Sequence, residues 1–339
     1  MKVLLVGEQS PGQLAWLCAR GFAQLRVVSA MVNTGGHPLE QYRASRWPPL
    51  SIVANLLQRR WVNARLRQLA AAFKPSLVLV TKGEEITPAT LRWIKRRVNA
   101  HLANWNPDSP LNPLNTTSDL LDTIPLYDDY YIWGKFLLPE LERLGARRPA
   151  YLPFAYDPDL HQPRALSQEE RAQWGNALTF VGTWERAREE ALNAVVDFDL
   201  GIWGNHWSRL APGSALRRCW RGEAHGEKLS RVYSASSIAL NFIREQNGSA
   251  HNMRTFEAPV CGIMLLTTRT EEQVELLGED RGAVFFGNVE EMRSKAGYYL
   301  AHPERREAVA AEGRHRLASG HTYADRMAVV MAAADRGSG

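Results

Sequence analysis

Short apolar runs recur along this chain, and each leads through a loop into a segment with helical spacing. Val3 to Val6 runs into the glycine-bearing loop 7–12, and residues 13–23 then show a helical apolar pattern. Leu178 to Val181 opens the second half in the same way, after a proline-interrupted segment at 157–163. Strands that alternate with helices are typical of parallel sheets whose two faces are covered by helices. The sequence therefore predicts an α/β protein with two doubly wound domains.

The other apolar runs extend this pattern through both halves. Further strands are predicted at 26–29, 76–81, 101–105, 130–133 and 150–154, and then at 200–204, 237–242, 263–266 and 283–286. Predicted helices lie at 51–73, 87–98 and 189–196, around Lys228 and Tyr233, and from 289 to the end of the chain. A chain of 339 residues is long enough for two such domains. We place the linker between them at 156–175.

The cysteines and the lengths of the apolar runs indicate the cellular compartment in which the protein is expected. Cys18, Cys219 and Cys261 are far apart and have neither disulfide-framework nor metal-ligand spacing, which favours a reducing compartment. The apolar run at the N-terminus is too short for a signal peptide, and no stretch approaches the roughly 20 apolar residues of a membrane span. We therefore expect a soluble, cytoplasmic protein without a transmembrane segment.

Positive charge is concentrated in the first half. Residues 1–150 hold 19 Lys and Arg against 11 Asp and Glu, whereas residues 151–339 hold 22 against 25. Arginines interleave with Trp47 and Trp61 at the helix predicted for 51–73, whose expected apolar face comprises Ile52, Leu56, Trp61, Leu66, Leu69 and Phe73. Such a basic surface points to an anionic partner, namely a phosphate-bearing lipid, a membrane surface or a nucleic acid. A general arginine bias is the alternative, because 34 of the 41 basic residues are Arg.

The segment Asn252 to Leu266 combines a charged helix start, a small-residue turn and a buried strand. Arg254 and Glu257 lie three residues apart and therefore share one face of the predicted helix. A cation and a carboxylate near a helix N-terminus suit a ligand that carries both phosphates and sugar hydroxyls. A surface ion pair on an ordinary helix is the alternative.

Three carboxylates of the first half lie in loops that follow predicted strands. Glu8 follows the first strand, Glu85 follows the strand at 76–81, and Asp108 follows the strand at 101–105. Parallel sheets place functional groups in the loops at the carboxyl ends of their strands, so all three are candidates for general acid–base chemistry. Each can also serve as an ordinary turn residue or helix cap.

Four segments of the second half form a set that spans residues 178 to 331. They are Phe180-Val181-Gly182-Thr183 with Arg186 and Arg188, Leu200-Gly201-Ile202-Trp203-Gly204, Asn252-x-Arg254-x-Phe256-Glu257 with Gly262, and Gly313 with His321-Thr322-Tyr323 and Arg326. Together they resemble the GT-B glycosyltransferases, and among these the CgeB-like spore-maturation group. The first half matches more loosely, through Thr81-Lys82-Gly83 and Trp105 to Asp108.

The resemblance implies two facing Rossmann-like domains with an interdomain cleft. Residues 1–155 would bind the acceptor, 176–320 would bind a nucleotide-diphospho-sugar donor, with a UDP-sugar expected, and the helix at 321–339 could pack back on the first domain. Glu257 would accept hydrogen bonds from the ribose hydroxyls, which requires its carboxylate to be open to the cleft. The other implied donor-binding residues are Asn252, Arg254, Gly182, Thr183, Arg186, Arg188 and Lys228. No metal or cofactor is implied, because arginines and helix N-termini can stabilise the leaving nucleoside diphosphate.

One position departs from the pattern of many retaining relatives, which carry two glutamates eight residues apart. The position eight before Glu257 is Ser249, so retaining and inverting chemistry both stay open. An inverting enzyme needs a base for the acceptor hydroxyl, for which Asp108 is preferred, followed by Glu8 and Glu85.

The identity of the acceptor is also open. An anionic or membrane-presented acceptor is expected, and the latter would place the protein peripherally at a membrane. A hydroxylated DNA base is the alternative. A nucleotide-sugar-binding protein without catalysis is the third hypothesis, and it is motivated by Ser249.

Overall fold

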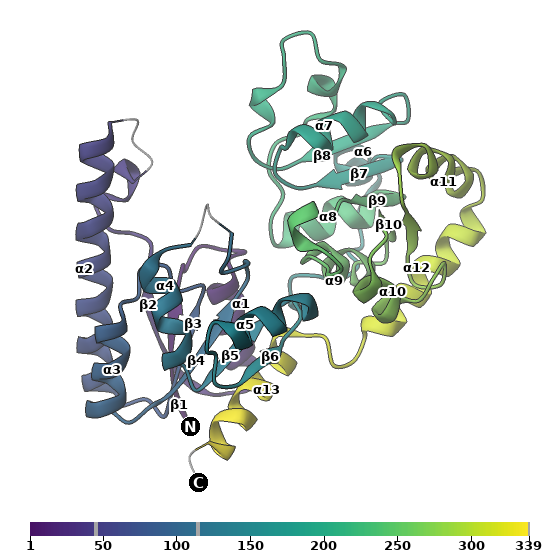
Figure 1. Ribbon diagram of the computed structural model, residues 1–339. Coiled ribbons are helices and arrows are strands. Elements are labelled where there is room, and N and C mark those ends of the chain that lie inside the picture. The colour runs from purple at the N-terminus through teal and green to yellow at the C-terminus, as the bar shows by residue number, and fades with distance from the viewer. Residues whose placement is uncertain (44–46, 113–115, 338–339) are drawn as a thin grey trace. The chain divides into compact units, whose positions relative to one another are not determined.

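The computed structural model describes residues 1–43, 47–112 and 116–337 (Figure 1). Within these ranges the chain forms two compact units. Unit 1 contains residues up to Pro153 together with 323–337, and unit 2 contains residues 154–322. The chain therefore passes from one unit to the other twice, after Pro153 and after Thr322.

The described part of unit 1 is built on a parallel sheet with the strand order β2-β1-β3-β4-β5-β6. Its strands are β1 (Lys2–Gly7), β2 (Val28–Asn33), β3 (Leu77–Thr81), β4 (His101–Asn106), β5 (Asp129–Ile132) and β6 (Pro149–Tyr151). Strands β3 and β4 are buried along their whole length. Such burial is expected of central parallel strands with helices on both faces.

The helices of unit 1 connect these strands. They are α1 (Leu14–Gln24), α2 (Pro48–Phe73), α3 (Pro88–Arg97), α4 (Ser118–Thr123), α5 (Leu138–Arg143) and, from the far end of the chain, α13 (Tyr323–Arg336). Helix α13 packs against α1. A Cβ atom on Gly21 would come within 2.7 Å of the backbone oxygen of Tyr323, so this close approach requires glycine. Arg326 Nε also donates to the carbonyl of Pro153 at 2.9 Å, which fastens the helix where the chain leaves the unit.

The described part of unit 2 is built on a second parallel sheet, with the strand order β11-β10-β9-β7-β8. Its strands are β7 (Leu178–Val181), β8 (Leu200–Trp203), β9 (Ile238–Asn241), β10 (Met264–Thr268) and β11 (Val284–Phe286). Its helices are α6 (Gln168–Trp174), α7 (Arg186–Asn193), α8 (Glu227–Ala235), α9 (Arg254–Val260), α10 (Glu271–Leu277), α11 (Val289–Ala301) and α12 (Pro303–Leu317). The core includes Phe180, Trp207 and Phe286.

In each sheet the first strand of the unit lies between the second strand and the third. Strand β1 pairs with both β2 and β3, and β7 pairs with both β8 and β9. The loops after these neighbouring strands run in opposite directions, which leaves a crevice at the carboxyl end of the sheet. The predicted α/β class with two doubly wound sheets is confirmed, and a ligand site is expected at each crevice.

The apolar face predicted for the helix at 51–73 is wrong for its first half, up to Trp61, whereas Leu66 is buried as predicted. Ile52 and Leu56 are exposed, with 65% and 45% of their surface accessible, whereas Gln58 and Asn63 are buried. The two amides can be buried because they find partners: Gln58 Nε2 donates to the carbonyl of Thr34 at 2.5 Å, and Asn63 Nδ2 donates to the carbonyl of Glu85 at 2.7 Å. Two satisfied amides therefore share the inward face of α2 with Ala54, Val62 and Leu66, while large apolar groups of its first half face outward.

Some element boundaries also differ from those expected. Strand β2 begins at Val28 and extends to Asn33, beyond the predicted strand at 26–29. Residues 156–175, expected to be a linker, belong to unit 2 and contain α6, which begins with a capping box between Ser167 and Glu170. None of the helices in the described ranges combines the length and the hydrophobicity that crossing a bilayer requires.

Candidate functional site

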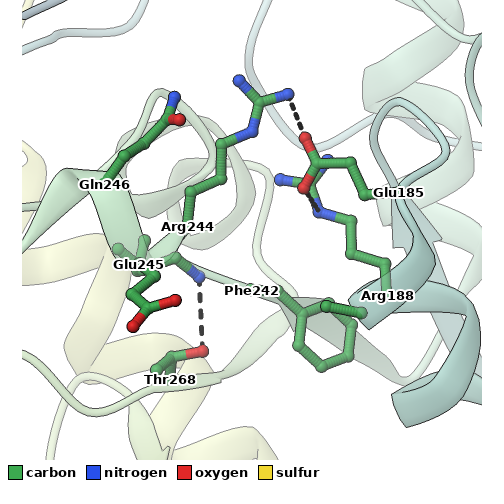
Figure 2. Close-up of a pocket in the computed structure, with 9 residues that line it drawn as sticks. Glu185, Arg188, Phe242, Arg244, Glu245, Gln246 and Thr268 are labelled. Carbon is green, nitrogen blue, oxygen red and sulfur yellow. Dashed lines mark hydrogen bonds and ion pairs between the residues drawn. The ribbon is translucent and has the colours of Figure 1, made fainter. Parts of the chain in front are cut away.

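A pocket of about 620 Å³ lies at the crevice of unit 2 (Figure 2). Its walls come from the loop after β7 with the start of α7, from the loop after β9, and from the end of β10. The lining residues are Glu185, Ala187, Arg188, Phe242, Ile243, Arg244, Glu245, Gln246 and Thr268. The first-turn amides of a helix have no acceptor within the helix, so the start of α7 brings partial positive charge to this pocket.

Arg188 is the buried cation of the pocket. Its Nη1 donates to the carbonyl of Thr183 at 2.9 Å, and its guanidinium lies 5.6 Å from the centre of the Phe180 ring. Burial lowers the pKa of Arg188 to about 10; Glu185 opposes this shift, while Arg244 and Arg254 add to it. Arg188 therefore stays charged at neutral pH in a place where an additional anion would be stabilised.

Glu185 connects two arginines of the pocket. Its Oε2 lies 3.4 Å from Arg188 Nε, and its Oε1 forms an ion pair with Arg244, as Figure 2 shows. Arg244 was missed by the sequence analysis. It follows β9 directly, so the reasoning that selected the loops after strands in the first half would have found it here.

Arg254, at the start of α9, lies against the end of β7. Its Nε donates to the carbonyl of Val181 at 3.2 Å, and its guanidinium pairs with Glu257. Arg188 contacts the carbonyl two residues further along the same loop. Two arginines from different helices therefore hold the loop that follows β7.

Glu257 does not have the open carboxylate that a ribose contact requires. Only 2% of its surface is accessible, because Arg254 covers it on one side and His161 Nε2 lies 3.7 Å from its Oε1. His161 Nδ1 accepts from the backbone N–H of Asp157, so the neutral ring carries its proton on Nε2, toward Glu257. Burial raises the pKa of Glu257, but the attraction of Arg254 and His161 outweighs it and holds the pKa below its usual value.

The expectation of an open Glu257 is therefore corrected. Its spacing from Arg254 does put both residues on one face of α9, as predicted. Spacing alone does not determine which of the two covers the other. Here the longer side chain of Arg254 remains partly accessible, and the shorter Glu257 lies beneath it.

Gly182 and Thr183 begin the loop after β7, and their backbone carbonyls accept hydrogen bonds from side chains of unit 2. Trp207 Nε1 donates to the carbonyl of Gly182 at 2.9 Å, and Arg188 donates to that of Thr183. A Cβ atom on Gly182 would come within 2.7 Å of the Phe180 ring. The glycine is thus required by packing of the loop against β7.

Of the eight predicted donor-binding residues, Arg188 alone is among the residues that line this pocket, and Asn252, Arg186 and Lys228 are engaged elsewhere in unit 2. Asn252 exchanges amide hydrogen bonds with Asn241 and accepts from the backbone N–H of Thr255, so its side chain is engaged within unit 2 at the start of α9. Arg186 is exposed and pairs with Glu190 on the outer face of α7. Lys228 lies over the rings of Trp203 and Trp174, at 5.0 and 5.4 Å from their centres.

A second pocket, of about 310 Å³, lies at the crevice of unit 1 and brings together all three predicted acid–base candidates. Glu8 reaches it from the end of β1, Glu85 from the loop after β3, and Asp108 from the loop after β4. The other lining residues are Gln13, Leu14, Ala15, Thr34, Arg43, Thr81, Lys82, Glu84 and Pro107.

Two cations balance the carboxylates of this second pocket. Lys82 Nζ lies 3.2 Å from Asp108 and 3.1 Å from Glu84, and Arg43 lies 3.2 Å from Glu85. Burial lowers the pKa of Lys82, but Asp108 and Glu84 more than offset this, so its pKa lies above the usual value. Burial raises the pKa of Glu85 more than Arg43 lowers it. Lys82 also has a left-handed backbone, with φ of 63°, which is uncommon outside glycine and places it where functional residues are often found.

No group of three or more His, Cys, Asp or Glu side chains within the described ranges is placed to hold a metal ion.

Comparisons with known proteins address the same regions. Residues 185–332 match a family described as glycosyl transferase-like. This match starts at Glu185 and includes every residue of the first pocket. No protein with curated annotation matches the chain.

Solved structures match the chain over nearly its whole length. Sucrose-phosphate synthase from Thermosynechococcus elongatus is 13% identical, with 98% of each chain covered and a TM-score of 0.68. Anabaena HepE in complex with UDP-glucose is 11% identical, with 100% of this chain and 99% of that chain covered and a TM-score of 0.67. An α-glucosyltransferase in complex with UDP and a 13-mer DNA that contains an HMU base is 9% identical, with 99% of each chain covered and a TM-score of 0.63. These likenesses establish that the chain has the GT-B fold of glycosyltransferases, with a glycosyl transferase-like region at residues 185–332.

Proposed function

We propose that this protein is a glycosyltransferase that moves a sugar from a UDP-sugar to an acceptor hydroxyl. The observation that carries the proposal is the pocket at the crevice of unit 2, where Arg188 and Arg244 meet the start of α7. Guanidinium groups and helix amides are the groups that proteins use to bind phosphates. A finer placement in the CgeB-like group rests on the four sequence segments named above.

The diphosphate of the donor would lie between Arg188, Arg244 and the amides of the first turn of α7. Glu185 pairs with both arginines, and a diphosphate would take over these ion pairs. The same groups would stabilise the negative charge that develops on the leaving UDP, so the reaction is proposed to need no metal ion. UDP is the proposed nucleotide because both HepE and the α-glucosyltransferase were solved with UDP or UDP-glucose.

Glu257 is proposed to act through Arg254. The buried carboxylate orients the guanidinium at the end of β7, where Arg254 adds to the positive charge around Arg188. This role replaces the ribose contact expected from the sequence.

Asp108 is the proposed general base, with Glu8 and Glu85 as the other carboxylates of the same pocket. Its carboxylate would accept the proton of the acceptor hydroxyl while the hydroxyl oxygen attacks the anomeric carbon. The bond from that carbon to the diphosphate oxygen breaks, and UDP leaves with the bonding electrons. This sequence inverts the anomeric configuration and agrees with Ser249 at the position where retaining relatives carry a glutamate.

Calorimetric titration with UDP tests the donor site. Arg188→Gln should weaken UDP binding by about 1.5–3 kcal/mol, the range for a hydrogen bond to a charged group, while retaining a donor for the carbonyl of Thr183. Arg186→Gln is the matched control, because Arg186 lies two residues away but is exposed and outside the pocket. Arg244→Gln provides a second test at an exposed position. Unchanged UDP affinity in both pocket variants would overturn the assignment.

A hydroxylated DNA base is the alternative acceptor. The α-glucosyltransferase with DNA shares the fold, and residues 1–150 carry an excess of positive charge. Binding to duplex DNA would weaken steeply as salt is raised, whereas binding of an uncharged acceptor would not. Turnover of UDP-glucose by water or any acceptor would exclude the hypothesis of a binding protein without catalysis. The compartment is proposed to be the cytoplasm, since all three cysteines are free and buried.

A further inference from the structure

We propose that the first half of α2 is a docking surface for an anionic lipid membrane. The surface consists of an apolar stripe, which comprises Trp47, Ile52, Val53, Leu56, Leu57 and Trp61, and of the arginines that accompany it. This inference is drawn from unit 1 alone and does not depend on the proposed transferase activity.

The apolar stripe is exposed although it is made of large side chains. Trp47 and Ile52 have 63% and 65% of their surface accessible, and the other four members are also exposed. Helix α2 instead packs with Ala54, Gln58, Val62 and Leu66 toward unit 1. Exposed apolar side chains are ordinary when scattered, but a contiguous group is typical of an interaction site. Figure 1 shows this half of α2 at the margin of unit 1, beside η1 (Glu40–Tyr42).

The charged residues of α2 itself have one sign. The sequence contains no Asp or Glu from residue 41 to residue 83. Within α2 lie Arg59, Arg60, Arg65 and Arg67, of which Arg59 pairs with Asp119 on α4. Arg60 is exposed and lies one turn after Leu56 and Leu57, so it accompanies the stripe directly. Positive charge beside an apolar surface complements the headgroups and the acyl chains of an anionic membrane.

The composition of the stripe favours a membrane over a nucleic acid. Four of its six members are aliphatic, and aliphatic side chains gain nothing from phosphates and do not stack on bases as aromatic rings do. Trp47 and Trp61 stand at its two ends, and tryptophan is enriched at the boundary between headgroups and hydrocarbon. An exposed apolar stripe on a helix, with arginines beside it and a tryptophan at each end of the stripe, suits insertion parallel to the membrane plane.

The stripe is connected to the pocket of unit 1. Arg43 donates through Nε to Asn55 on α2 at 2.8 Å, and it also pairs with Glu85 in that pocket. Gln58, which follows Leu57 in α2, donates to the carbonyl of Thr34, which lines the pocket too. A membrane bound at α2 would therefore lie beside the pocket that contains Asp108. If the proposed transferase activity holds as well, its acceptor would be presented by that membrane.

Vesicle flotation with the full chain and without any nucleotide tests the docking surface. We expect the protein to float with vesicles of phosphatidylcholine and phosphatidylglycerol, and to do so less with phosphatidylcholine alone or at high salt. The double variant Ile52→Gln, Leu56→Gln should weaken binding about tenfold or more, because two aliphatic contacts with the acyl region are lost. Val329→Gln is the matched control, since Val329 is an exposed aliphatic residue on α13 and should bind like the wild type.

The electrostatic part is tested separately. Arg60→Gln should weaken binding to the anionic vesicles about fivefold and leave binding to neutral vesicles unchanged. Arg143→Gln, which removes the same charge from an exposed position on α5, should change neither. Far-UV circular dichroism and thermal melting establish that each variant is folded.

Three outcomes would overturn the inference. One is the absence of flotation with anionic vesicles, and another is equal flotation of the wild type and the Ile52, Leu56 variant. The third is a dimer, seen by light scattering, that the same variant abolishes, because the stripe would then be an interface between two copies of the chain. Loss of UDP binding or of turnover has no bearing on this test.

Discussion

Two glutamates, the partly buried Glu85 in unit 1 and the buried Glu257 in unit 2, each lie beside one arginine, yet their pKa values move in opposite directions. Burial raises the pKa of Glu85 more than Arg43 lowers it, and the nearby Glu84 adds to the rise. Burial also raises the pKa of Glu257, but here Arg254 and His161 act together and the net shift is downward. The cations and anions around a buried carboxylate, and not burial alone, therefore decide which protonation state is favoured.

The two pockets also differ in the charged side chains that line them. Both lie at the point where the strand order of a parallel sheet reverses. In unit 1 this position collects carboxylates around one lysine and one arginine, whereas in unit 2 it collects arginines around a helix start. The backbone topology provides the crevice, and the side chains of the loops determine whether it suits proton transfer or anion binding.

The largest expected effect tests whether the pocket of unit 1 serves catalysis while the pocket of unit 2 binds UDP. Asp108→Asn should lower the rate of sugar transfer by about 10²–10⁴-fold, the usual contribution of a general base, and leave UDP affinity unchanged. The rate is measured as UDP release, and the affinity by calorimetry. Glu84→Gln is the control, because Glu84 shares the same lysine partner as Asp108. A parallel loss of UDP affinity in the Asp108 variant would show that the pockets do not divide the work in this way.

The next effect concerns how Glu257 acts. Glu257→Gln should weaken binding of both UDP and inorganic pyrophosphate, by about 1–3 kcal/mol, because Arg254 loses the charge that orients it. Titration calorimetry with each ligand measures this. Glu190→Gln, which removes the exposed partner of Arg186, should change neither affinity. If UDP binding weakens and pyrophosphate binding does not, Glu257 acts on the nucleoside, as the sequence first suggested.

The smallest effect is a contrast in the pH dependence of stability. The pKa of Glu85 is raised in the folded protein, so its contribution to stability falls as pH rises from its ordinary value of 4.5 through the folded-state pKa. Glu85→Gln should therefore compare more favourably with the wild type at neutral pH than at acidic pH. The pKa of Glu257 is lowered, so its contribution is present above 4.5 and is lost as pH falls through the folded-state pKa. Glu257→Gln should lose most stability at neutral pH.

Urea unfolding at about pH 3 and pH 7 distinguishes the two cases, because the ordinary glutamate pKa of 4.5 lies between these two pH values. Changes of the same sign in both variants would mean that the two carboxylates do not differ in the way described here.

Much of the architecture could be predicted because short apolar runs separated by loops allow few arrangements. The predicted positions of the parallel strands also brought Glu8, Glu85 and Asp108 to one pocket, although 100 residues separate the first from the last. This step needs no side-chain detail, since the carboxyl ends of parallel strands share one edge of the sheet.

The parts that could not be predicted depend on partners distant in the sequence. The orientation of α2 follows from hydrogen bonds of Gln58 and Asn63 to carbonyls more than 20 residues away, and a hydrophobicity pattern does not contain this information. The burial of Glu257 depends in the same way on His161. Asn252 has the polar side chain that the predicted donor contact requires, but its amide donates to the side chain of Asn241 at the end of β9.

The position of α13 has a consequence for biosynthesis. Residues 1–153 of unit 1 leave the ribosome before unit 2, but Gly21 of α1 packs against Tyr323, which is made only after all of unit 2. Unit 1 is therefore begun before unit 2 and completed after it. During translation, unit 2 can reach its full set of internal contacts while the face of α1 that packs against α13 is still exposed.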